Sequence, residues 1–332
     1  MDLFKNPQKF GHGLFLAPMA GVTDQTYRAI CKSFGAEFLV TEMVSSKGVY
    51  FNDKKTGRLA RIEEGESPAG VQIFGHEPEI MAIAAQKLVA LDYNGCVSER
   101  APDFVDINMG CPVHKIVSSG DGSALMKNPD LIYDIVKAVA SAVNVPVTVK
   151  IRAGWDKNSI NATECAKAAE EAGASLITVH ARTREQMYTD FYDWSVIADV
   201  KKSVSVPVVG NGSIFSAADV LAIKEQTGCD GVMIGRACQG NPFIFREIRQ
   251  ALEGKEITPK TNEEVANIAA RHLEMICREK GEMIGILEMR KHLGWYSHSM
   301  RGSPTFRNKC NLATTFQEMM ELTKWLADPK EE

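Results

Sequence analysis

A cysteine stands in an unusual position in the stretch DINMGCPVHKIV, which begins at Asp106. Cys111 follows an apolar run that ends in Gly110, and Pro112 comes directly after it. Gly110 lets the chain turn close to a ligand, and Pro112 favours an extended backbone at Cys111. A thiol has an ordinary pKa of about 8.5, so at the rim of a binding site it can donate a proton near neutral pH. The alternative is a small buried side chain without chemistry, as most free cysteines are.

Polar side chains also close most of the other apolar runs of the chain. The first run ends in Pro18, Met19 and Ala20, and the later ones deliver Gln72, Asn108, Lys150, Arg152, His180, Arg182, Asn211 and Arg236. A chain selected for stability alone does not need this pattern, because an inward-facing Lys150 or His180 is costly to bury without a partner. The alternatives are an ion pair between Lys150 and a carboxylate, and a hydrogen-bonded core histidine at position 180. The pattern favours a functional site.

Glycine-bearing turns follow the last two runs, Gly210-Asn211-Gly212-Ser213 and Gly235-Arg236. Small residues let backbone N–H groups approach an anion and Arg236 can clamp it, so these turns suit a terminal phosphate. No glycine-rich dinucleotide loop follows the first run, where residues 20–25 are AGVTDQ. A mononucleotide, FMN, therefore fits better than FAD or NAD as the resident cofactor. Lys150 beside its ring would stabilise the anionic reduced flavin.

Eight short β-rich runs position these residues. They cover 14–19, 38–43, 69–75, 104–110, 145–152, 175–182, 206–212 and 231–236. Helical spacing of apolar residues lies between them, at 23–35, 77–90, 128–143, 161–174 and 216–228. Near-continuous apolar strands indicate a parallel sheet, and eight β/α units predict a (β/α)8 TIM barrel with its site at the C-terminal ends of the strands. The alternative, a doubly wound sheet, usually carries the dinucleotide loop that this chain lacks.

The pattern changes after residue 242, where only helical stretches follow, at 261–281, 285–300 and 305–328. We therefore expect a smaller C-terminal all-α helical domain, joined through a linker at 252–264. The predicted division is a TIM-barrel catalytic domain that binds FMN, residues 1–245, and a helical RNA-binding domain, residues 246–332.

The RNA-binding prediction depends on an acid-free stretch, because the net charge of −4 excludes only a uniformly basic protein. Residues 289–317 contain no Asp or Glu, and aromatic residues alternate there with basic ones. Basic groups neutralise phosphates and aromatic rings stack on bases. The alternative is a packed helical core that happens to lack acids. The residues predicted to contact RNA are Lys115, Arg152, Arg182, Arg184, Arg290, Lys291, Arg301 and Arg307.

Composition excludes several other classes of protein. No apolar run approaches the roughly 20 residues of a membrane span, and the N-terminus lacks the layout of a signal peptide, so we expect a cytoplasmic protein. The eight cysteines form no CxxC pair and show no regular spacing with histidines. We expect neither a metal site nor a disulfide framework, and no obligate protein partner is indicated.

Six motifs in this order resemble the tRNA-dihydrouridine synthase family: APMAGVTDQTYR, DINMGCP, VKIR, VHARTR, NGSI and MIGRACQGNPFIFREI. The tail segment RKHLGWY resembles the bacterial B class of that family. The resemblance implies an oxidoreductase that reduces the C5=C6 bond of uridine in tRNA to 5,6-dihydrouridine. NADPH, or NADH, would reduce FMN, the flavin N5 would pass a hydride to C6, and a cysteine would protonate C5.

By motif match, the resemblance makes Cys111 the proton donor and places Asn108 beside the flavin and the uracil. The FMN contacts that it implies are Pro18, Met19, Ala20, Gln72, Asn108, Lys150, His180, Asn211, Gly212, Ser213, Gly235 and Arg236. The target base lies within folded RNA, so it must be flipped out to reach the flavin.

Two departures from the family pattern stand out. Ser213 replaces the usual aspartate of an NGD motif, and residues 93–103, with Cys96, look longer than usual. Three rival functions share parts of the pattern: an FMN barrel that reduces a free pyrimidine or enone, a non-catalytic RNA-binding protein, and a Schiff-base aldolase that uses Lys150. Bound flavin would exclude the last two rivals, and activity on tRNA rather than on free uridine would exclude the first.

Overall fold

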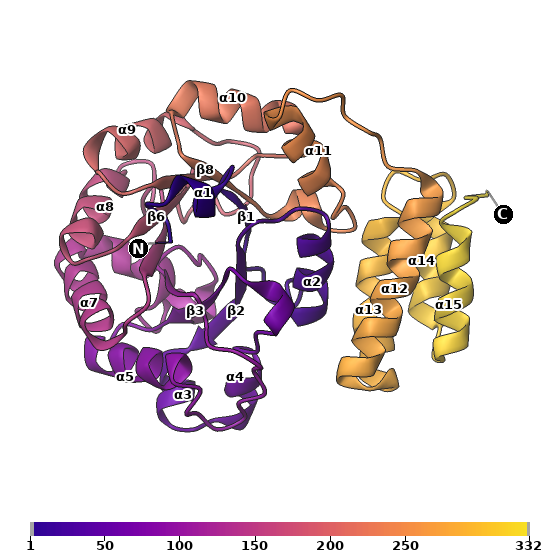
Figure 1. Ribbon diagram of the computed structural model, residues 1–332, viewed down its shortest axis with the longest axis horizontal. Coiled ribbons are helices and arrows are strands. Elements are labelled where there is room, and N and C mark those ends of the chain that lie inside the picture. The colour runs from indigo at the N-terminus through magenta and orange to yellow at the C-terminus, as the bar shows by residue number, and fades with distance from the viewer. Residues whose placement is uncertain (1–2, 331–332) are drawn as a thin grey trace.

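Eight parallel strands form a closed barrel in the computed structural model, which describes residues 3–330 (Figure 1). The strand order is β1-β8-β7-β6-β5-β4-β3-β2. A bridge between Phe15 and Phe38 closes it, since the Leu16 N–H donates to the Phe38 carbonyl at 2.9 Å. The strands are β1 (Leu14–Leu16), β2 (Leu39–Ser45), β3 (Ala69–Phe74), β4 (Phe104–Asn108), β5 (Val147–Arg152), β6 (Leu176–His180), β7 (Val208–Asn211) and β8 (Gly231–Ile234). The predicted (β/α)8 barrel is confirmed.

Helices surround the barrel and cover the outer faces of its strands (Figure 1). They are α1 (Pro7–Phe10), α2 (Gln25–Ser33), α3 (Ser46–Tyr50), α4 (Lys54–Arg58), α5 (Pro78–Val89), α6 (His114–Val117), α7 (Pro129–Ala142), α8 (Ala162–Glu171), α9 (Ser195–Ser203), α10 (Ala217–Thr227) and α11 (Ile244–Leu252), with the 3-10 helices η1 (Glu64–Glu66), η2 (Gly122–Lys127) and η3 (Arg236–Cys238). All five predicted barrel helices are present. The sequence did not predict α1, α3, α4, α6, α9 or α11.

Aromatic rings fill the N-terminal end of the barrel interior. Phe15 and Phe38 stack with their centroids 4.4 Å apart, and Phe4 lies edge-on to Phe104 at 5.3 Å. Leu176, Val209 and Met233 complete this buried cluster. Because apolar side chains occupy that end, the inward-facing polar residues of the strands gather at the opposite, C-terminal end, where barrel sites lie.

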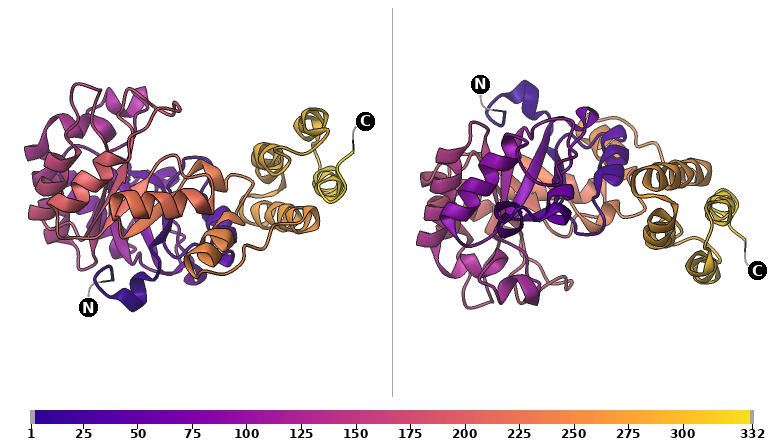
Figure 2. Two further views of the ribbon diagram at one scale, coloured as in Figure 1. Left: turned by 90° about the horizontal axis from the view of Figure 1, so that it is seen from above. Right: turned by 90° about the horizontal axis from the view of Figure 1, so that it is seen from below.

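Four further helices stand together beside the barrel (Figures 1 and 2). They are α12 (Asn262–Lys280), α13 (Glu282–Tyr296), α14 (Ser303–Leu312) and α15 (Phe316–Trp325). The stretch 305–328 is divided into two helices, because Thr315 and Glu318 form a capping box that starts α15. The boundary predicted at residue 245 falls inside α11, and the chain reaches α12 through residues 253–261. The division into two domains stays a prediction.

The four helices α12 to α15, called the helical group below, dock on α2, the helix that follows the first strand. Asp24 caps α2 by accepting the Tyr27 N–H, and its carboxylate also lies 2.5 Å from the Lys280 ammonium of α12. The Tyr27 ring lies 5.3 Å from the His272 ring and 5.4 Å from the His292 ring. The end of the loop after β1, at Asp24 and Tyr27, is therefore held both by the barrel helix α2 and by the helical group. Within residues 3–330, no helix is long and apolar enough to cross a membrane.

Candidate active site

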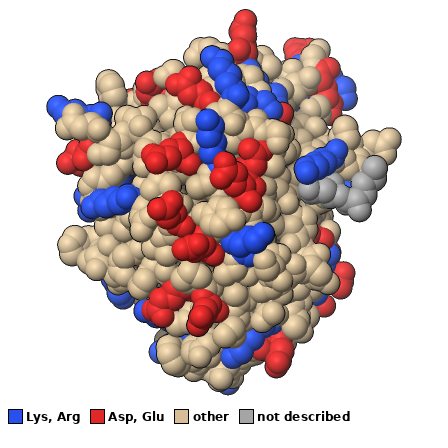
Figure 3. Space-filling view, turned by 90° about the vertical axis from the view of Figure 1, so that its left-hand side faces the viewer, with Lys and Arg blue, Asp and Glu red and all other residues tan. Residues whose placement is uncertain are grey.

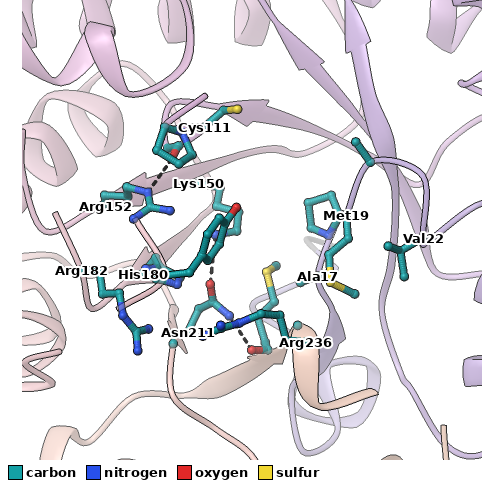
Figure 4. A pocket seen from close by; sticks show the side chains of 18 of the residues that line it. Ala17, Met19, Val22, Cys111, Lys150, Arg152, His180, Arg182, Asn211 and Arg236 are labelled. Atoms are coloured by element: carbon teal, nitrogen blue, oxygen red, sulfur yellow. Dashed lines mark hydrogen bonds between the residues drawn. The ribbon is translucent and has the colours of Figure 1, made fainter. Parts of the chain in front are cut away.

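A cavity of about 460 Å³ opens at the C-terminal ends of the strands (Figure 4). It brings together Cys111 and every residue predicted to contact the cofactor: Pro18, Met19, Ala20, Gln72, Asn108, Lys150, His180, Asn211, Gly212, Ser213, Gly235 and Arg236. Arg152 and Arg182 line it too. Lys115, Arg184 and the four basic residues predicted in the tail do not. The predicted residues therefore form two groups, those that line the cavity and those that lie outside it.

Lys150 lies in the wall of the cavity and donates to the Asn211 side-chain oxygen at 3.1 Å (Figure 4). The Asn211 amide in turn donates to the Met233 carbonyl at 2.7 Å, which fixes its orientation. Burial and then the nearby Arg152 lower the pKa of Lys150 to about 8. Among the ion pairs of the described residues, none joins Lys150 to a carboxylate. A charged ammonium that no carboxylate contacts directly suits an anionic or electron-accepting ligand.

Two buried nitrogens in the cavity wall have no hydrogen-bond partner within the described part of the chain, His180 Nδ1 and Arg182 Nη1. Burial, followed by repulsion from Lys150 and other cations, holds the pKa of His180 well below its ordinary value, so the ring is neutral at pH 7. Arg182 uses its other nitrogens on the Thr189 carbonyl at 2.7 Å and the Ser213 hydroxyl at 2.6 Å. Buried polar groups rarely lack partners, so these two nitrogens mark a place for a polar ligand.

Gly212 leaves room for that ligand. Its φ of +107° suits glycine, and a Cβ there would lie 3.4 Å from both Arg182 Nη1 and His180 Cε1. A side chain would crowd the two unpartnered groups. The residues present therefore fit a phosphate-bearing flavin: a cationic fork, a neutral histidine, a lysine and a glycine turn converge on one cavity.

Cys111 lies at the rim, and three hydrogen bonds hold its backbone. Its N–H donates to the Asn108 side-chain oxygen at 2.9 Å, and its carbonyl accepts from the Ser123 N–H at 3.1 Å and hydroxyl at 2.9 Å. Burial raises the pKa of the thiol, while the Val113 N–H, Arg152 and Lys150 oppose this rise. The thiol therefore keeps its proton at neutral pH, as a general acid must.

Arg152 is only 3% exposed, and its guanidinium contacts three carbonyls in two loops of the barrel mouth. It donates to the carbonyls of Gly110 at 2.7 Å, Thr183 at 2.8 Å and Met187 at 3.1 Å. These bonds hold the Cys111 loop against the loop after β6. This arrangement assigns Arg152 a structural task, and its contact with RNA stays a prediction.

Tyr188, on the loop after β6, is a cavity residue that the sequence reasoning missed. Its ring is 51% exposed and lies 5.7 Å from the Arg152 guanidinium and 5.3 Å from that of Arg236. The Arg236 guanidinium also lies 5.8 Å from the Phe215 ring. Cation–π contacts of this kind hold an otherwise exposed ring at the cavity mouth. The available signal was the presence of three aromatic residues among positions 188–192, in the loop that follows β6.

Two buried polar residues under the cavity were also missed, Asp106 and Thr148. Burial raises the pKa of Asp106 to about 6, against the hydrogen bonds from Gln72 and Thr148, which lower it. Alternation along a strand would have revealed both residues. Asp106 shares a face with Asn108, and Thr148 shares one with Lys150, because each pair is two residues apart.

The outer basic residues lie on two surfaces. On the barrel rim Lys115 is exposed, and the Arg184 guanidinium lies 4.8 Å from the Trp155 ring. On the helical group Arg301 and Arg307 are exposed and Lys291 is half-buried, and the Lys291 ammonium reaches the loop after β1 near Gly21. By contrast, the barrel face turned away from this group carries intermixed acidic and basic side chains (Figure 3).

Other parts of the acid-free stretch are occupied in packing. Arg290 donates to the Ala313 carbonyl at 2.7 Å, Tyr296 and Phe306 are buried, and Phe306 stacks on Trp325 at 4.2 Å. The Trp295 ring lies edge-on to His292 at 5.0 Å. The exposed cations of this stretch, Arg301, Arg307 and Lys309, therefore stand among neutral side chains, whereas its aromatic rings are buried or half-buried.

Sequence comparisons cover almost the whole chain. Residues 15–328 match the family model described as "Dihydrouridine synthase (Dus)". The chain is 43% identical over 303 residues to tRNA-dihydrouridine synthase B of Pseudomonas syringae pv. tomato, which covers 91% of this chain and 87% of that protein. It is 41% identical over 324 residues to tRNA-dihydrouridine synthase B of Shewanella oneidensis, 97% of each chain. The similarity therefore spans both the barrel and the helical group.

Solved structures share the barrel at low sequence identity. The 6-hydroxypseudooxynicotine amine oxidase (HisD) of Pseudomonas geniculata N1 superimposes with a TM-score of 0.53 and 15% identity, over 73% of this chain and 47% of that one. The old yellow enzyme homologue of Zymomonas mobilis gives a TM-score of 0.50 and 12% identity, over 80% of this chain and 96% of that one. These likenesses concern the fold alone.

Proposed function

The chain belongs to the dihydrouridine synthase family, as its motifs predicted, and from this premise we propose that it reduces uridine in tRNA to 5,6-dihydrouridine. The proposed resident cofactor is FMN, and the proposed reductant is NADPH or NADH. The observation that carries the proposal is a single cavity with unpartnered buried nitrogens on one wall and a protonated thiol at its rim. A free pyrimidine or enone is the rival substrate.

The residues that would hold FMN fall into two groups. Gly212, Ser213, Gly235, Arg236 and Arg182 suit its phosphate, because they offer backbone N–H groups and guanidinium donors. The residues that suit its ring system are Pro18, Met19, Ala20, Gln72, Asn108, Lys150, His180 and Asn211. When bound and reduced, the flavin supplies the hydride for C6 of uracil.

Cys111 would hold the proton that C5 receives. Burial keeps the thiol protonated before transfer, and the charges of Arg152 and Lys150 favour the thiolate that transfer leaves behind. Asn211 holds the Lys150 ammonium in place, so its charge faces the cavity, where negative charge develops during reduction.

RNA would approach over the barrel mouth, between the rim and the helical group. Lys115 and Arg184 on the rim, and Lys291, Arg301 and Arg307 on the helices, would contact phosphates while the target uridine is flipped into the cavity. A tRNA substrate would place the protein in the cytoplasm.

Two measurements test the proposal. Cofactor released from the purified protein by heat should be FMN by mass, at one per chain. The protein should form dihydrouridine in tRNA taken from a strain that lacks the modification, and should act far more slowly on free uridine. FAD, absence of flavin after reconstitution with FMN, or equal rates on free uridine would contradict it.

A further inference from the structure

A line of hydrogen-bonded side chains runs beneath the cavity and ends on the Cys111 backbone. Asp106 accepts from the Thr148 hydroxyl at 2.5 Å and from the Gln72 amide nitrogen at 2.6 Å. The Gln72 side-chain oxygen accepts from the Asn108 amide nitrogen at 2.8 Å. The Asn108 oxygen accepts the Cys111 N–H at 2.9 Å and the Gly110 N–H at 3.2 Å. The line thus joins three adjacent strands, β3, β4 and β5, to the thiol loop.

The carboxylate sets the direction of this line. A side-chain amide has a donor end and an acceptor end, whereas an ionised carboxylate only accepts. Asp106 therefore takes the nitrogen end of Gln72, which leaves the Gln72 oxygen for Asn108. The Asn108 oxygen is then left for the two backbone N–H groups. In the reverse direction, the Asn108 nitrogen would face the N–H of Cys111, donor against donor.

Outside this line, Asp106 attracts the charge of Lys150 but makes no ion pair in direct contact with it. It is 2% exposed, and the described ion pairs do not include it. Gln72 is 1% and Asn108 7% exposed, so water cannot readily replace a lost partner in this line.

We propose that Asp106 is a positioning residue: it orients the amides of Gln72 and Asn108 so that Asn108 holds the Cys111 backbone and thereby fixes the thiol at the cavity rim. The catalytic consequence, delivery of a proton by a fixed thiol, rests on the proposed function. The orientation of the amides does not.

The sharpest test moves the carboxylate from residue 106 to its hydrogen-bonded neighbour, residue 72. Gln72→Glu alone sets two acceptors against each other, 2.6 Å apart. In the double variant Asp106→Asn with Gln72→Glu, Asn at 106 can donate to Glu at 72 and accept from Thr148, while the second Glu oxygen accepts from Asn108. The hydrogen bonds from residue 72 through Asn108 to the Cys111 backbone then run in the wild-type direction. Both variants carry Glu at 72, so any direct effect of that carboxylate on the cofactor is shared.

A readout that does not depend on activity is the rate at which iodoacetamide alkylates Cys111 in the holoenzyme. This rate is measured from the mass of the peptide that contains Cys111. Gln72→Glu should raise this rate about tenfold, the equivalent of one disrupted buried hydrogen bond, and the double variant should return to within about twofold of wild type. Equal rates in the single and double variants overturn the proposal.

A second comparison keeps the test decisive if Gln72→Glu does not fold. Asp106→Asn removes the acceptor-only end of the line and leaves its direction to the two backbone N–H groups alone, whereas Thr148→Val removes one donor and keeps the carboxylate. Alkylation should accelerate several-fold in the first and stay within about twofold of wild type in the second. Equal rates in these two variants overturn the proposal.

Dihydrouridine formation in a single turnover with reduced protein is the second readout. It should be about tenfold faster in the double variant than in Gln72→Glu, since both carry Glu at the cofactor contact and differ only in the direction of the line. If the alkylation rates follow the prediction but the wild-type protein forms no dihydrouridine, the positioning role of Asp106 is upheld and the proposed function is overturned.

Discussion

The affinity for FMN should fall as pH rises, because Lys150 loses its positive charge. Its ammonium has a pKa of about 8, because it is buried and lies near Arg152. An anionic ligand in the cavity should restore this pKa toward its ordinary value, so binding must take up a proton when the free site has lost it. Below about pH 7 the lysine is almost fully charged in both states and affinity should be nearly constant. At pH 9 about nine-tenths of the free sites are neutral, so affinity should be about tenfold lower than at pH 7.

Titration of apoprotein with FMN, followed by quenching of flavin fluorescence between pH 7 and 9, measures this dependence. Lys150→Gln should bind more weakly at pH 7 and show no slope. Lys115→Gln is the matched control, since this exposed lysine lies outside the cavity and should keep the wild-type slope. A wild-type affinity that does not change from pH 7 to 9, or the same slope in Lys150→Gln, would refute the reasoning.

Three further predictions follow from other parts of the molecule. Burial lowers the pKa of His272 to about 4 despite the opposing charge of Asp24, so the stability that this residue contributes is present above pH 6.5 and lost as pH falls toward 4. The loss should be about 3 kcal/mol by urea unfolding at pH 7 and pH 4, and a folded His272→Leu variant with the same loss would contradict it. Replacing Lys291, Arg301 and Arg307 by alanine should weaken tRNA binding and lower its salt slope by about one unit per lost phosphate contact, with the flavin spectrum unchanged; an unchanged slope would move the RNA site to the rim. Gly122→Val should destabilise the fold by about 1–3 kcal/mol in thermal unfolding, because φ is +59° and its Cβ would lie 2.9 Å from the Cys111 carbonyl, and a variant as stable as wild type would show that this loop yields.

The strands could be predicted because each is a short apolar run whose composition matches a sheet covered on both faces. Among the helices that were missed, α11 does have the signal of an amphipathic helix, since its buried residues are Ile244, Phe245 and Ile248. Others lack a comparable signal. α3 and α4 have five residues each, and α9 has nine and follows an aromatic-rich loop. The division between α14 and α15 was available in the sequence, since Thr315 and Glu318 have the spacing of a capping box.

The cavity residues could be predicted because a barrel brings the C-terminal ends of its strands together. The partners of individual cations could not. Arg152 and Arg290 resemble RNA-binding residues in the sequence, but both donate to backbone carbonyls of neighbouring loops. Which carbonyl lies within reach depends on tertiary packing, and nothing near either arginine in the sequence encodes it.

A single-turnover comparison of wild type and Cys111→Ala tests the central claim most directly. Each protein, reduced in advance and freed of excess reductant, is mixed with tRNA that lacks dihydrouridine, and flavin reoxidation and dihydrouridine are followed together. Wild type should form one dihydrouridine per flavin reoxidised. Cys111→Ala should keep its flavin and its reduction by NADPH, but form product at least about 100-fold more slowly. Product formation at the wild-type rate would show that Cys111 is not the acid, and no dihydrouridine from wild type would contradict the proposed reaction itself.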